Sequence, residues 1–136
     1  MSLIAYALRM AKQYYKPETY NHALRVAQFV SENPMIPDEK MDECIALAIM
    51  HDLKEDTNWN GGFGGEFKHF KECLDLISKP MNMDYIDYIK NIRRFSNINP
   101  EAYWVKLADM KDHLTQIETL TDKLREKYLA ALPYLL

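Results

Sequence analysis

The sequence is poor in the residues that build sheets, tight turns and cross-links. It has four glycines and two cysteines among 136 residues, and all four glycines fall within residues 61–65. Because β-branched Val and Thr are also few, the composition favours helices and predicts no substantial sheet. The two cysteines, Cys44 and Cys73, lie in apolar helical patterns without CxxC spacing, so we expect reduced core residues rather than a disulfide.

The sequence also lacks clustered positive charge and long apolar runs. Its formal net charge is −3, which argues against a nucleic-acid partner because binding to a phosphate backbone depends on clustered Lys and Arg. No run approaches the ~20 apolar residues that cross a bilayer, and no cationic leader precedes an apolar block. We therefore expect a cytoplasmic protein without a membrane partner, folded as one domain over residues 1–136 and either monomeric or homodimeric.

Apolar residues at helical spacing predict six to seven helices, and so an all-α bundle. The expected helices cover 2–15, 19–31 with Thr19 as N-cap, 37–51, 66–78, a segment capped by Asn82 and running to 94, 101–120, and a last helix capped by Thr121. We expect Trp104, Leu107 and Ile117 to point inward from the sixth helix. Residues 58–65, which combine the aromatics Trp59 and Phe63 with four glycines, form a flexible loop that either covers a site or simply connects two helices.

The feature that points to chemistry is the pair His51-Asp52, which ends an apolar run from Cys44 to Met50. Burying two such groups without partners would cost several kcal/mol, roughly. Two further carboxylates, Glu55 and Asp56, follow within one helical turn. Taken alone, the stretch also fits a satisfied histidine at a helix end, followed by a solvated acidic turn.

Two other residues suit a metal site with this pair. His22 lies in the first turn of the second helix, although there it could simply bond to a carboxylate. Asp109 lies on the apolar face of the sixth helix, where a carboxylate needs a compensating partner. Together with His51 and Asp52 they offer two imidazoles and two carboxylates, which would neutralise a divalent cation. We expect Mn²⁺ or Fe²⁺ rather than Mg²⁺, with Zn²⁺, Co²⁺ and Ni²⁺ as alternatives.

This spacing resembles the H…HD…D pattern of the HD-domain metal-dependent phosphohydrolases. A sharper resemblance is to the hydrolase domain of the RelA/SpoT family and its small stand-alone relatives, which remove the 3′-pyrophosphate of the alarmone ppGpp. Three blocks carry it: YNHALRVA at 20–27, AIMHDLKEDT at 48–57 and VKLAD at 105–109. The resemblance covers nearly the whole chain and implies the helical HD-domain fold.

The resemblance also implies roles for individual residues. His22, His51, Asp52 and Asp109 would bind the metal, while Glu55 and Asp56 would orient and deprotonate the attacking water. On a helix Glu55 is the i+3 neighbour of Asp52, so its carboxylate can face that water. Substrate contacts are expected from residues in or near the blocks, namely Lys16, Arg25, Lys54, Lys106, His113, Arg125 and Tyr128.

The chain departs from the family in two places that bear on the substrate. The family's basic segment before the first histidine is missing, with only Lys12, Lys16 and Arg25 nearby, and the family's D-R-x-x-N block reads DMKDH at 109–113. We expect a metal-dependent phosphohydrolase acting on a small-molecule nucleotide, with ppGpp as the leading substrate. The alternatives are an HD-type 5′-nucleotidase acting on (deoxy)nucleoside monophosphates and a non-catalytic nucleotide-sensing module.

Overall fold

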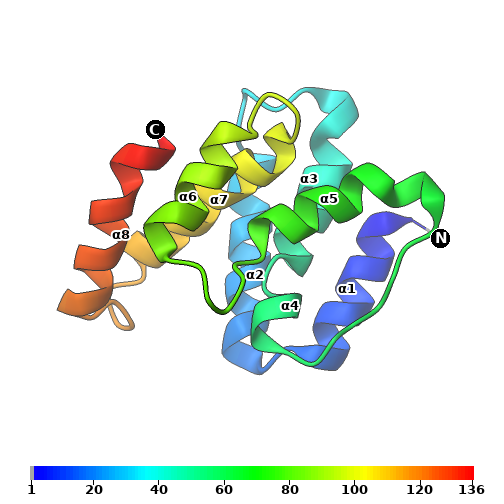
Figure 1. The fold of residues 1–136 in the computed structure, drawn as a ribbon. Coiled ribbons are helices and arrows are strands. Elements are labelled where there is room, and N and C mark those ends of the chain that lie inside the picture. Colours follow the sequence, from blue (N-terminus) through cyan, green and yellow to red (C-terminus); the bar gives the residue numbers. More distant parts are fainter. Residues whose placement is uncertain (1) are drawn as a thin grey trace.

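Helices supply the regular structure of residues 2–136, the part of the chain that the computed structural model describes (Figure 1). Those of ten residues or more are α1 Leu3–Tyr14, α2 Pro17–Ser31, α3 Asp38–Met50, α5 Lys68–Ile77, α6 Tyr85–Arg94, α7 Pro100–Thr115 and α8 Asp122–Leu135. A single turn, α4 Leu53–Asp56, and a short 3-10 turn, η1 Gly65–Phe67, complete the set. The prediction of an all-α bundle of six to seven helices is confirmed. None of these helices combines the length and the apolar character that crossing a membrane needs.

Helix α3 lies inside the bundle and ends at the HD pair. It packs against α1, α2, α5 and α7, and the side chains from Ala46 to Met50 are all buried. The reason is in the sequence, because an apolar run without a polar face must be surrounded on all sides. Helices α6 and α8 pack against each other and against α7, and α8 lies at the opposite side of the molecule from α1 (Figure 1).

Two helix starts differ from those predicted. Helix α2 begins at Pro17 rather than after Thr19, because proline fits the first helical position, where the missing N–H needs no partner. Helix α6 is capped by Asp84 rather than Asn82, since the Asp84 carboxylate accepts hydrogen bonds from two backbone N–H groups of the first turn. The predicted cap at Thr121 is confirmed by its hydroxyl, which accepts from a backbone N–H 3.1 Å away.

The end of α7 also differs, and it changes one predicted core residue. The helix stops at Thr115, and the Gln116 carbonyl then accepts from the backbone N–H groups of Thr119 and Leu120 in a tight turn. Ile117, expected to point inward, sits in this turn and is 80% exposed. Its prediction as a core residue was wrong because the chain leaves the helix before reaching it.

The glycine-rich loop between α4 and α5 packs against the rest of the protein through its aromatic residues. Trp59 is buried, and the Phe63 ring lies among the rings of Tyr6, Trp59, Phe67 and Phe70. A Cβ atom on Gly61 would lie 2.8–2.9 Å from atoms of the Trp59 indole, so only glycine lets the backbone pass so close to that ring.

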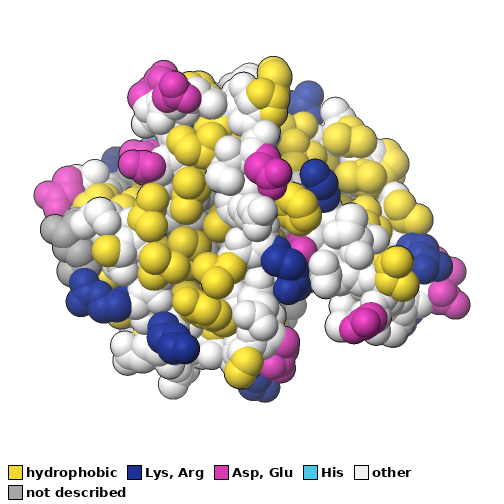
Figure 2. Space-filling view, turned by 180° about the vertical axis from the view of Figure 1, so that it is seen from behind, with side chains coloured by type: hydrophobic (Ala, Val, Ile, Leu, Met, Phe, Trp, Pro, Cys, Tyr) yellow, Lys and Arg dark blue, Asp and Glu magenta, His cyan; other side chains and the backbone are white. Residues whose placement is uncertain are grey.

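The surface seen from behind is mixed in character. Figure 2 shows hydrophobic side chains over much of this face, with Lys and Arg side chains separated by apolar and acidic ones. A nucleic-acid backbone is usually bound by a basic patch or stripe, and this face presents none.

Candidate metal centre

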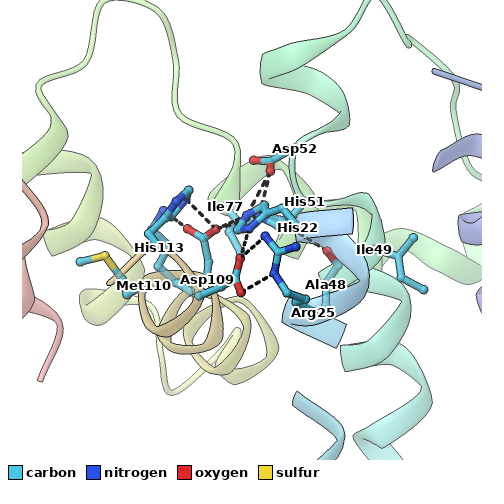
Figure 3. Close-up of polar contacts among 12 residues, drawn as sticks. His22, Arg25, Ala48, Ile49, His51, Asp52, Ile77, Asp109, Met110 and His113 are labelled. Carbon is cyan, nitrogen blue, oxygen red and sulfur yellow. Dashed lines mark hydrogen bonds and ion pairs between the residues drawn. The ribbon is translucent and has the colours of Figure 1, made fainter. Parts of the chain in front are cut away.

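The four residues predicted as metal ligands meet at one point, although they come from three segments of the chain. His22 is in α2, His51 and Asp52 follow the end of α3, and Asp109 is in α7. One ligand atom from each lies within 4.8 Å of those of the other three. Figure 3 shows the two imidazoles and two carboxylates turned toward one another.

Asp109 Oδ1 is at the centre of this cluster. It lies 2.8 Å from His22 Nε2 and 3.1 Å from His51 Nε2. Asp52 Oδ2 lies 3.5 Å from His22 Nε2 and 3.2 Å from His51 Nε2. Two nitrogen and two oxygen donors thus converge, a donor set that suits a divalent first-row ion.

The second ring nitrogen of each histidine has an acceptor of its own. His51 Nδ1 lies 2.6 Å from the Ala48 carbonyl oxygen. Because a carbonyl only accepts, Nδ1 carries the proton, and Nε2 of the neutral ring presents a lone pair to the cluster. His22 Nδ1 lies 2.6 Å from Asp112 Oδ2, which favours the same tautomer. Histidines that bind metals are commonly held in this way.

Asp112 is a site residue that the sequence reasoning missed. Arg25 donates from Nε to its Oδ1 at 2.8 Å and from Nη2 to its Oδ2 at 3.0 Å. Burial alone would raise the pKa of Asp112, but its hydrogen bonds to Arg25 and His22 outweigh burial and lower it. Asp112 lies i+3 from Asp109 on the buried side of α7, so the criterion that selected Asp109 would have found it.

Lys106 is buried beside Asp109 and orients its carboxylate. Its Nζ donates to Asp109 Oδ2 at 2.8 Å and lies 5.0 Å from the ring centre of Tyr88. Burial alone would lower the pKa of Lys106, but the charge of Asp109 raises it well above its usual value. In return, the Lys106 charge overcomes burial and holds the pKa of Asp109 well below its usual range. The carboxylate therefore stays ionised, with Oδ1 left free to face the histidines.

The cluster favours positive charge at its centre. Burial alone would lower the pKa of His51, yet the charges of Asp52 and Asp109 raise it to about 9. Burial also opposes charge on His22, but the hydrogen bond to Asp109 raises its pKa. A divalent cation bound by the Nε2 lone pairs would supply the positive charge that protonation of the two histidines otherwise supplies. The donor set present therefore fits a metal ion.

Glu55 and Asp56 lie on α4, just beyond the HD pair. Both side chains are exposed, but partial burial of the carboxyl groups raises the pKa of each, with a contribution from the charge of Asp52. Asp56 lines a hollow of about 390 Å³ beside His22, and both residues line a neighbouring hollow. Carboxylates with raised pKa values at such a place are suited to accept a proton.

Three of the predicted substrate contacts lie beside the cluster. Arg25 and His113 line the hollow next to His22, and Lys16 lines the neighbouring one. His113 Nε2 lies 3.2 Å from Asp109 Oδ1. Its ring stacks on that of Tyr128, with centroids 4.7 Å apart, so Tyr128 supports His113 from behind.

The other three predicted contacts are paired with carboxylates of the protein itself. Lys54 pairs with Asp75, Lys106 is buried against Asp109, and Arg125 Nη1 lies 3.3 Å from Asp122 Oδ1. None of these three lysine and arginine side chains lines the hollow beside His22. The basic character available to a ligand there comes mainly from Arg25.

Comparison with known proteins leaves the chain without an assigned family. No protein-family model matches it, and no curated protein matches it either. The resemblance to HD-domain hydrolases thus depends on the motif residues and on the geometry that brings them together.

Proposed function

We propose that the chain is a metal-dependent phosphohydrolase acting on a nucleotide. The observation that carries this proposal is the convergence of His22 Nε2, His51 Nε2 and carboxylate oxygens of Asp52 and Asp109, with a separate partner holding each histidine. A divalent cation held by these four residues would act as a Lewis acid, lowering the pKa of water and offsetting charge on the phosphorus oxygens.

The remaining residues of the site would bind substrate and move protons. Glu55 and Asp56 would accept the proton of the attacking water at a carboxylate oxygen, which their raised pKa values favour. Arg25, whose side chain is 39% exposed, would contact a phosphate from the wall of the hollow. His113, held between Asp109 and Tyr128, would orient the phosphate or the sugar.

The leading substrate is ppGpp, because the HDLKEDT run and the VKLAD block resemble those of ppGpp hydrolases. The reaction would consume one water and release pyrophosphate from the 3′ position, leaving GDP.

The charge of the hollow supports a second candidate, a nucleoside 5′-monophosphate. Glu18, Asp52, Asp56 and Asp112 line the hollow; the cation would offset Asp52 and Arg25 pairs with Asp112, so Glu18 and Asp56 leave the wall acidic. An acidic wall opposes a polyanion more strongly than it opposes a single phosphate of charge about −2. The site would then act as a 5′-nucleotidase.

The test is an assay of the purified chain with Mn²⁺, offering ppGpp and deoxynucleoside monophosphates separately. We expect pyrophosphate from ppGpp or phosphate from the monophosphates. Asp52→Asn and Glu55→Gln should each lower kcat by about 10²-fold or more. The matched substitutions Asp42→Asn and Glu126→Gln, at exposed positions outside the cluster, should leave it unchanged.

Two results would contradict the proposal. Full activity in Glu55→Gln would exclude this carboxylate as the base. Tight nucleotide binding by calorimetry with no product from any of these substrates would support a sensing module instead of an enzyme.

A further inference from the structure

A second cluster of potential ligands lies where α5 meets the start of α7. His69 and Cys73 are four residues apart on α5 and share one face of it, and Glu101 faces them from the first turn of α7. One ligand atom from each lies within 4.8 Å of the other two. We propose that His69, Cys73 and Glu101 form a second metal site, which takes a thiophilic divalent ion such as Zn²⁺.

The distances fit a zinc ion with little rearrangement. Cys73 Sγ lies 3.7 Å from His69 Nε2, and His69 Nε2 lies 2.7 Å from Glu101 Oε2. Ligand atoms of a tetrahedral zinc ion, at bond lengths of about 2.0–2.3 Å, lie about 3.3–3.8 Å apart. The sulfur–nitrogen distance already falls in that range. The nitrogen–oxygen distance would open by about 0.6 Å when the ion replaces the shared proton.

Glu101 carries an incompletely satisfied charge. It is 2% exposed, and its Oε1 is buried without a hydrogen-bond partner among the described residues. Leaving a buried acceptor unpaired costs free energy, and more so for a charged group. Its Oε2 contacts His69, with Lys40 Nζ at 3.6 Å. A cation beside this carboxylate would compensate the negative charge that these contacts leave partly unpaired.

Cys73 supplies the ligand that selects the metal. The residue is fully buried, and Asn99 Nδ2 donates toward its sulfur at 3.4 Å. Burial raises the pKa of the thiol to about 12, so it stays protonated without a metal. Binding of the ion would release that proton to solvent and leave a thiolate. The thiolate and the Glu101 carboxylate together would balance the charge of Zn²⁺.

The proposed site is reached from the surface through His69, whose side chain is 43% exposed. Three protein ligands leave the fourth position of a tetrahedral ion for water or another small ligand. The site shares no residue with the His22 cluster, so it does not depend on the hydrolase proposal.

The absorption spectrum of bound Co²⁺ distinguishes the two clusters, because only the second contains a cysteine. Metal-free protein is titrated with Co²⁺ while the near-ultraviolet absorption is followed. We expect a thiolate-to-cobalt charge-transfer band whose final intensity corresponds to one thiolate-bound Co²⁺ per chain, whatever Co²⁺ the first cluster also takes up, and which disappears when Zn²⁺ is added. Cys73→Ser should abolish the band, whereas Cys44→Ser, at a buried cysteine outside the cluster, should keep it.

Two more variants guard against misfolding as an explanation. His69→Gln changes a partly exposed residue and should weaken the affinity reported by the band about tenfold or more. Asp52→Asn, in the first cluster, should leave the band unchanged, and circular dichroism should show native helix content in all variants. No band in the wild-type chain at millimolar Co²⁺, or a band that survives Cys73→Ser, would overturn the proposal.

Discussion

The two clusters use similar side chains but differ in how firmly each ligand is held. In the first, three of the four ligands, His51, His22 and Asp109, are held by the Ala48 carbonyl, Asp112 and Lys106 respectively. In the second, Glu101 keeps a buried oxygen without a partner among the described residues. A prearranged ligand set loses less free energy to ordering when it binds. We expect the first cluster to bind its metal the more tightly, while the second depends on sulfur for its selectivity.

The largest effect is expected from Asp109→Asn. This change replaces the central carboxylate with a neutral amide and leaves buried Lys106 without its counter-charge, so the free energy of unfolding should fall by about 3–5 kcal/mol. Chemical denaturation measures the loss. Adding Lys106→Met should restore much of the stability but not Mn²⁺ binding. If the single variant were as stable as the wild type, the ion pair would not support the first cluster.

The next largest effect is expected from adding Mn²⁺, which should stabilise the protein through the first cluster and not through the second. Mn²⁺ at 100 times its dissociation constant should add about 2.7 kcal/mol to the free energy of unfolding. Asp52→Asn should remove this gain, whereas Cys73→Ser should retain it, because Mn²⁺ prefers nitrogen and oxygen over sulfur. Thermal unfolding with and without a chelator checks both. An equal loss in the two variants would mean that Mn²⁺ does not distinguish the clusters.

A smaller effect should follow from Asp112→Asn. The substitution weakens the hold on His22 Nδ1 without touching a ligand, so Mn²⁺ affinity should fall about 10–100-fold. Calorimetric titration measures the change, with Asp42→Asn as the control. Unchanged affinity would show that Asp112 serves only its ion pair with Arg25.

The smallest effect concerns Cys44, which neither proposal uses. Burial raises the pKa of its thiol to about 12, compared with about 8.5 for a free cysteine. The folded protein therefore holds this proton more tightly than the unfolded chain, and Cys44 makes unfolding easier as the pH rises above about 8.5. Alkylation of Cys44 at pH 9 should be slow in the native protein and fast in guanidinium. Rapid native alkylation would contradict the burial of this thiol.

Much of the fold was predictable because apolar periodicity reports which faces are buried. The exact helix ends were less so, since they depend on single interactions. Asp84 rather than Asn82 caps α6, and the turn after Thr115 leaves Ile117 exposed. Predicting either helix end would require the path of the backbone beyond the helix, which the apolar periodicity does not give.

The candidate site was predictable where a residue type was costly in its place. Asp109 and the HD pair could be predicted as site residues because burying them without partners is costly. The structure brings them together with His22. The choice of partners was not predictable in the same way. Lys106 and Asp109 are i, i+3 neighbours on α7, a spacing that permits their contact without requiring it, because the Lys106 side chain could also have reached toward substrate. Glu101 resembled an ordinary acidic first turn until α5 placed His69 beside it.

Because the backbone at Gly61 passes close to the Trp59 indole, the fluorescence of this tryptophan should depend on the conformation of the loop. A methyl group at position 61 would meet the ring at 2.8–2.9 Å, so Gly61→Ala must lift either the ring or the backbone. Trp59 is 7% exposed, and contact with water would shift its fluorescence to longer wavelengths. With the second tryptophan replaced, as in Trp104→Phe, the emission wavelength of Trp59 can therefore report whether a ligand or a metal at either cluster moves the segment that joins α4 to α5.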